Sequence, residues 1–196
     1  IEYSYLLTAG NIATIRETFT ARKDFTDNAD LRVNYQSSRL PSVDGDITKL
    51  DFTGGQNLAL LTNPMDTTVV YDEAMGAVKL TAGSVGDVSV TIPYGSSPTP
   101  LSAESYKTLK IEYMIPTDAS MSSYQSDLFI CTGNIKAPDG NARIRVDLVK
   151  DGEYHVLEVK LAGNPYWTGD IHMIRFDYFD FSAAGDVMYI KNISLE

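Results

Sequence analysis

Few residues in this chain could carry out covalent chemistry. The 196 residues include two histidines and one cysteine, so a Ser/His/Asp triad or a Cys/His pair has few possible members. His155 and His172 lie in no recognisable motif. Asp177 and Asp180 could form the carboxylate pair that glycoside cleavage needs, but no glycosidase motif surrounds them. The sequence therefore favours a protein without catalytic activity.

Aromatic and planar polar side chains offer a different chemistry, the binding of sugars. An aromatic ring can stack on the apolar C–H face of a pyranose, and polar groups can hydrogen-bond to its hydroxyls. Trp167 follows Tyr166 in the loop 163–169 and is the only tryptophan, so this pair is the first candidate. A tryptophan just ahead of a strand can equally be buried in the core. Three further candidates lie in or beside predicted loops: Tyr94, Tyr106 and Tyr124.

Charged side chains gather around a predicted hairpin. Asp151-Gly152 separates two alternating runs and suits a two-residue type I′ turn. The resulting register places Arg145 opposite Glu158, with Ile144 opposite Val159 and Val146 opposite Leu157. One face is then apolar and the other charged, with members Arg143, Arg145, Asp147, Glu158 and Lys160, extended by Arg175 and Asp177. This charged face is either a glycan platform, with Arg143 and Arg145 as ligand-binding residues, or a salt-bridge ladder that keeps the surface hydrated.

Clustered aspartates in loops suggest a structural calcium ion, because Ca²⁺ prefers carboxylate and carbonyl oxygens. Asp180 with Asp186 is the cluster that we expect to bind it. Asp24 with Asp27 and Asp30, and Asp44 with Asp46, are further candidates. None matches the spacing of an EF-hand loop, and aspartates also cap turns through their own side chains.

Composition restricts the partners of the chain. The formal net charge of −10 and the pI of about 4.6 would repel a phosphate backbone, which argues against nucleic acid. The sequence contains no run of ~20 apolar residues that could insert into a membrane. With Cys131 as the single cysteine, no disulfide can form within the chain. The chain begins at Ile1 without a signal segment, so we expect a piece of a longer multi-domain protein.

Short alternating runs separated by Gly, Pro, Asn and Asp predict an all-β fold from residue 46 onward. The predicted strands are Thr48–Phe52, Thr67–Tyr71, Ala77–Ala82, Asp87–Pro93, Thr108–Ile115, Asp127–Cys131, Arg143–Val149, Tyr154–Leu161, Ile171–Phe179 and Val187–Leu195. Such strands pack as an antiparallel β-sandwich. Residues 1–45 differ in pattern and are interpreted as an N-terminal extension or the end of a preceding module.

Several segments of this sandwich resemble a known family. They are Ser105-Tyr106-Lys107-Thr108-Leu109-Lys110-Ile111, Asp151-Gly152-Glu153-Tyr154-His155, Trp167-Thr168-Gly169-Asp170-Ile171, Ile174-Arg175-Phe176-Asp177, Gly185-Asp186 and Tyr189-Ile190-Lys191-Asn192-Ile193-Ser194-Leu195. Together they are similar to galactose-binding-like jelly rolls, the fold of many bacterial carbohydrate-binding modules.

The resemblance implies a jelly-roll β-sandwich in a secreted or cell-surface bacterial protein, with a polysaccharide or other glycan as partner. Related modules often place a calcium-binding acidic residue near the position of Tyr189-Ile190, but Lys191 follows here, which argues against that metal. Two alternatives stay open: a structural or adhesion module without a sugar site, and a β-sandwich glycan lyase or hydrolase. Fold alone does not decide among them.

Overall fold

The computed structural model describes residues 46–196 except 84–85 and 87. The chain divides into two units, Ile1–Asp44 and Gly45–Glu196, and only the second is described below. The predicted N-terminal extension and the aspartates at 24, 27, 30 and 44 lie outside the described residues.

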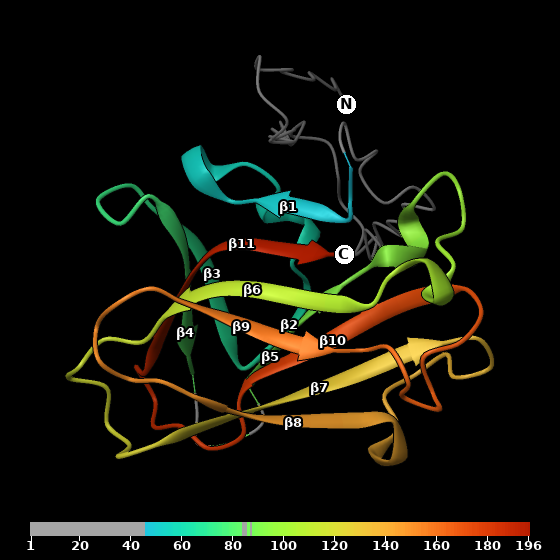
Figure 1. The fold of residues 1–196 in the computed structure, drawn as a ribbon. Helices are drawn as coiled ribbons and strands as arrows, with labels where there is room; N and C mark the ends of the chain where they lie inside the picture. The colour runs from blue at the N-terminus through green and yellow to red at the C-terminus, as the bar shows by residue number, and fades with distance from the viewer. Residues whose placement is uncertain (1–45, 84–85, 87) are drawn as a thin grey trace, which may run out of the picture. The chain divides into compact units, whose positions relative to one another are not determined.

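The described residues form two antiparallel sheets and no α-helix, which confirms the predicted jelly-roll β-sandwich. The first sheet has the order β3-β4-β11-β6-β9, with β1 also paired to β11; the second has the order β2-β5-β10-β7-β8. The strands are β1 (Lys49–Asp51), β2 (Thr62–Met65), β3 (Thr67–Asp72), β4 (Ala77–Ala82), β5 (Val88–Ile92), β6 (Thr108–Met114), β7 (Tyr124–Thr132), β8 (Arg143–Leu148), β9 (His155–Lys160), β10 (Ile171–Phe179) and β11 (Val187–Leu195). Figure 1 shows β6, β9 and β11 in one layer and β7, β8 and β10 in the other.

Short 3₁₀ helices occur in several connections. They are η1 (Thr53–Gly55), η2 (Leu58–Leu60), η3 (Tyr94–Ser96), η4 (Ala103–Ser105) and η5 (Gly140–Ala142). None of the helices in the described part of the chain is long and apolar enough to cross a membrane.

The core lies between the sheets and follows from the alternation of buried and more exposed side chains in strands such as β6 and β11. Ile111 in β6 pairs with Ile193 in β11, and Ile174 in β10 pairs with Ile130 in β7; all four side chains are fully buried. Burying one such side chain contributes ~1.5–3 kcal/mol. Successive side chains in a strand point to opposite faces, so the packed inner faces determine which residues face outward.

Strand β2 is the one described strand that the sequence did not predict. Its residues, Thr62-Asn63-Pro64-Met65, lack alternation and include a proline. Proline cannot donate to a ladder and is tolerated at a sheet edge. Strand β2 is an edge strand, paired only with β5 in its sheet.

The predicted hairpin between residues 143 and 161 is wrong. Strand β8 pairs with β7, whereas β9 pairs with β6 in the other sheet. Arg145 therefore faces Asp127, and Glu158 faces Lys110. The predicted turn is present, since Gly152 adopts a φ of 80°. The Gly152 N–H, however, donates to the carbonyl of Ile115, which follows β6, at 3.0 Å. The same turn chemistry serves a hairpin and a crossover between sheets, so the local sequence could not distinguish them.

Candidate functional site

The outward side of the β2-β5-β10-β7-β8 sheet carries polar side chains in rows across three strands. Register places Arg143 beside Phe129 and Phe129 beside Arg175; the next row joins Arg145, Asp127 and Asp177. In the third row Asp147 lies beside Gln125. We call this set the polar face: Gln125, Asp127, Phe129, Arg143, Arg145, Asp147, Arg175 and Asp177. The predicted charged face is thus correct for its members in β8 and β10, whereas Glu158 and Lys160 belong to the other sheet.

A buried carboxylate holds two arginines of the polar face in place. The Nε and Nη2 atoms of Arg145 donate to the two carboxylate oxygens of Asp127 at 2.9 Å each, and Nη1 of Arg143 donates to Oδ2 at 3.2 Å. The hydrogen bond from Arg145 holds the pKa of Asp127 below its ordinary value although burial opposes this. The Asp127 side chain is only 4% exposed, against 43% for Arg143 and 42% for Arg145. Solvent therefore meets guanidinium groups with a carboxylate beneath them.

The third arginine of the polar face is held in a similar way. Arg175 donates from Nε and Nη2 to the two carboxylate oxygens of Asp177, at 2.6 and 2.8 Å. Its guanidinium carbon lies 5.4 Å from the centroid of the Phe129 ring, within the range of a cation–π contact. The only arginines between residues 46 and 196 are Arg143, Arg145 and Arg175. All of them therefore lie on one face, where each pairs with a carboxylate.

A depression of about 510 Å³ lies next to this arginine network. Its lining residues are Ser120, Met121, Ser122, Ser123, Gln125, Asp147 and Phe181. Gln125 donates from Nε2 to Oδ1 of Asp147 at 2.6 Å, which fixes two planar polar groups in the lining. The Phe181 side chain is 63% exposed, an unusual placement for a large apolar ring. Hydroxyls, an amide, a carboxylate and an aromatic ring thus line one concave site.

Most aromatic residues that the sequence suggested for sugar binding are buried. Trp167 is only 5% exposed, and its Nε1 donates to the carbonyl of Tyr106 at 2.9 Å. Tyr94 and Tyr124 are also buried, and Tyr106 is half-buried. A buried ring has no free face to offer a sugar, so Trp167, Tyr94 and Tyr124 cannot stack on a ligand in this structure.

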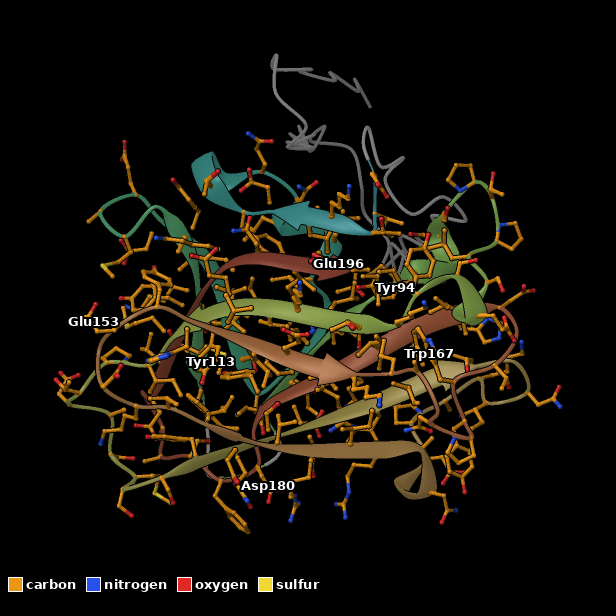
Figure 2. The ribbon with its side chains drawn as sticks, viewed as in Figure 1. Tyr94, Tyr113, Glu153, Trp167, Asp180 and Glu196 are labelled. Carbon is orange, nitrogen blue, oxygen red and sulfur yellow. The ribbon has the colours of Figure 1, made fainter. Side chains whose placement is uncertain are left out.

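Tyr166 stays exposed at 38%, but it does not line the depression. Figure 2 shows Trp167, the neighbour of Tyr166 in sequence, well apart from Asp180, which borders the polar face. The structure thus brings Arg143 and Arg145 together but separates them from the predicted Tyr166-Trp167 pair.

Sequence reasoning overlooked Phe181 and Gln125. Phe181 lies two residues after the end of β10 at Phe179 and precedes the polar and small residues Ser182 to Asp186. A phenylalanine in such a turn is a signal of an exposed ring, but a weak one, because turns next to strands often tuck apolar residues into the core.

The aspartates predicted to bind calcium have protein partners. Asp180 forms an ion pair with Nη2 of Arg145 at 2.9 Å. Asp186 accepts hydrogen bonds from Ser120 N and Oγ, Tyr124 Oη and Ala183 N at 2.7–2.9 Å. Within the part of the chain that the structure describes, no three His, Cys, Asp or Glu residues gather as metal ligands. Calcium binding stays a prediction.

The residues considered for catalysis are likewise engaged in hydrogen bonds. Asp177 accepts from Arg175, and Asp180 pairs with Arg145. His155 lies 2.9 Å from Asp151, and Nε2 of His172 lies 2.9 Å from the carbonyl oxygen of Gly133. Each of these four side chains thus has a hydrogen-bond or ion-pair partner among the described residues.

Comparisons with known proteins find similarity among solved structures. No protein-family model and no curated protein sequence matches the chain. Among solved structures, it is similar to a low-affinity xylan-binding module of family 86 from Roseburia intestinalis, with 14% identity over 76% of this chain and 94% of that one and a TM-score of 0.45. A family 29 carbohydrate-binding module shows 16% identity over 74% of this chain and 86% of that one, with a TM-score of 0.48.

An exo-β-agarase gives a TM-score of 0.53 at 13% identity, where the match covers 74% of this chain and 24% of the agarase. At these identities the likeness is one of fold. The likeness to the agarase agrees with the β-sandwich fold that the sequence predicted.

Proposed function

We propose that the domain is a non-catalytic carbohydrate-binding module that holds a polysaccharide on the polar face and in the adjoining depression. The observation that carries this proposal is the exposed Phe181 ring beside a depression lined by hydroxyl, amide and carboxylate groups. Sugar recognition needs this combination of a ring for stacking and planar polar groups for hydroxyls.

Binding would divide between the two parts of the site. Phe181 stacks on one sugar ring, while Gln125, Asp147 and the serines of the depression exchange hydrogen bonds with its hydroxyls. Neighbouring sugars reach Arg143 and Arg145, whose carboxylate partners already hold them in position. A pre-organised side chain loses less conformational entropy on binding. Affinity should nevertheless be modest, because an open site leaves much of the ligand in water.

The proposed setting is a bacterial protein at the cell surface or outside the cell, in which this domain is one part of a longer chain. A xylan-binding module and part of an exo-β-agarase are similar to this domain in fold. An accessory domain of this kind would keep its parent protein on a polysaccharide without cleaving it.

A second candidate is a structural or adhesion module without a sugar site. The burial of Trp167, Tyr94 and Tyr124 favours it, because this alternative predicts few exposed rings. It leaves unexplained why Phe181 is exposed beside a depression and why the arginines of the domain share one face.

Affinity electrophoresis on a panel of xylan, mannan, hydroxyethylcellulose, agarose and pectin separates the two candidates. We expect native protein to be retarded by at least one polysaccharide and Phe181→Ala to bind about tenfold more weakly, since an aromatic stacking contact is worth ~0.5–1.5 kcal/mol beyond the area it buries. Arg143→Ala should also weaken binding, while Asp127 keeps Arg145 as its partner.

Tyr166→Ala is the matched control, because it removes another exposed ring that lies outside the depression. If no polysaccharide retards the native protein, the adhesion module becomes the better description. If Tyr166→Ala loses binding and Phe181→Ala keeps it, the site lies at the loop 163–169 instead.

A further inference from the structure

The depression is built by two loops that are far apart in sequence. Ser120, Met121, Ser122 and Ser123 belong to the β6–β7 loop, residues 115–123, whereas Phe181 belongs to the β10–β11 loop, residues 180–186. Loops of this kind lose their shape easily unless other groups fix their backbone. The hydrogen bonds behind the lining therefore decide whether the depression exists before a ligand arrives.

Asp186 joins the two loops from behind. One carboxylate oxygen accepts from the Ser120 N–H at 2.9 Å, and the other accepts from Ser120 Oγ at 2.7 Å and from Ala183 N at 2.8 Å. The hydroxyl of Tyr124, at the start of β7, donates to the same oxygen at 2.8 Å. Asp186 is buried and does not line the depression. A single carboxylate thus ties Ser120 to the loop that carries Phe181.

Lys150 holds the β6–β7 loop from a third direction. It comes from the connection between β8 and β9, and its Nζ donates to the carbonyls of Ala119 at 2.6 Å and Met121 at 2.8 Å. These carbonyls flank Ser120, whose N–H is bound by Asp186. The backbone at 119–121 is therefore held by hydrogen bonds from Lys150 and to Asp186. Lys150, like Asp186, does not line the depression.

We infer that Lys150 and Asp186 are positioning residues that hold the depression in its binding shape and thereby set its affinity for the sugar without touching it. We call these two residues the loop clamp. This inference rests on the proposed function. Its physical basis is that a site populated for only part of the time binds in proportion to that population. Releasing either side of the clamp lets residues 119–123 leave the wall of the depression, which weakens binding even when every lining residue is intact.

Two substitutions with matched controls test the loop clamp. Lys150→Met removes the charged donor and keeps an unbranched side chain, and Lys160→Met is its control, because Lys160 is exposed on β9 in the other sheet. Asp186→Asn removes one acceptor oxygen, and Asp170→Asn is its control, because Asp170 is exposed outside the depression. Titration calorimetry measures Kd for the polysaccharide of the panel that native protein binds, and hydrogen exchange measures amide protection in residues 119–123.

We expect both clamp variants to raise Kd by about tenfold, with unchanged stoichiometry and unchanged β-sheet circular dichroism, while the controls bind as native protein does. Exchange should rise in residues 119–123. Lys150→Arg should restore most of the affinity, because a guanidinium can still donate to both carbonyls. A role in global stability alone would lower the melting temperature without changing Kd in the folded protein.

Faster exchange at 119–123 with native Kd in Lys150→Met overturns the loop clamp. Should Asp186→Asn fail to fold, Lys150→Met and Lys150→Arg decide the matter. The proposed function fails by a different result, in which native protein binds no polysaccharide or Phe181→Ala binds as tightly as native protein.

Discussion

Replacing Trp167 by alanine should destabilise the domain rather than remove a sugar contact. A tryptophan side chain buries ~150–250 Å², and Trp167 is almost entirely buried. At about 25 cal/mol per Å² this corresponds to ~4–6 kcal/mol, close to the ~3–5 kcal/mol typical of Phe or Trp truncation in a core. The hydrogen bond from Nε1 to the Tyr106 carbonyl adds about 1 kcal/mol. We expect a loss of about 4–6 kcal/mol.

For a domain of this size, each kcal/mol of lost stability lowers the melting temperature by ~2–4 °C, so Trp167→Ala should melt about 8–24 °C below native protein. Because Trp167 is the only tryptophan, its removal also removes the intrinsic tryptophan signal. Urea unfolding should therefore be followed by far-ultraviolet circular dichroism and calorimetry. Trp167→Phe is the control: it keeps an aromatic ring in the core, loses the hydrogen bond and should cost less than the alanine variant.

Native protein provides a second readout of the same reasoning. Its tryptophan emission should be blue-shifted, protected from acrylamide, and unchanged when a bound polysaccharide is added. A Trp167→Ala protein that unfolds within about 1 kcal/mol of native would refute the burial argument, as would one that stays folded and loses polysaccharide binding.

Three further predictions concern acidity, an orphan hydroxyl and calcium. Hydrogen bonds from Arg145 lower the pKa of Asp127 in the folded protein below its ordinary value of 3.8. The ionised carboxylate therefore stabilises the fold fully at a pH above that ordinary pKa, and this stabilisation is lost as the pH falls through the lowered pKa. Asp127→Asn should make the fall in melting temperature below pH 4 less steep. The Tyr94 hydroxyl is buried without a hydrogen-bond partner among the described residues, so Tyr94→Phe should leave stability unchanged or raise it by up to ~1 kcal/mol in urea unfolding. If Asp180 and Asp186 bind calcium, millimolar Ca²⁺ should raise the melting temperature relative to EDTA; if their protein partners replace the metal, the two curves should coincide.

Local sequence was sufficient to locate most strands of the sandwich. Alternation in Leu109, Ile111 and Tyr113, and the apolar run in β10, mark strands wherever they pair, because one face of each must be buried. The same alternation already placed Arg143, Arg145 and Asp147 on one exposed side. Their grouping with Arg175 and Asp177 was therefore within reach of the sequence.

Partnership between strands was decided only by the tertiary structure. The stretch from Arg143 to Lys160 carries the signals of a hairpin, yet β8 and β9 are edge strands of different sheets. Whether an Asp-Gly turn returns a strand beside its neighbour or carries it across the core depends on which distant strands offer a complementary edge. Here β8 pairs with β7, which places Arg145 opposite Asp127, and β9 pairs with β6, which places Glu158 opposite Lys110. Such long-range competition leaves no trace in the turn itself.

Tertiary structure also decided which aromatic rings meet water. Trp167 and Phe181 both lie in loops that flank β10. The sequence singled out Trp167, the only tryptophan, as a candidate that could equally be buried, and it did not single out Phe181. The fold buries Trp167 against the Tyr106 segment and exposes Phe181 beside Ser120–Ser123. Burial of a loop side chain depends on which segment, distant in sequence, packs over it. Residue types thus determined the sandwich and its charged side, whereas packing between segments determined the candidate site.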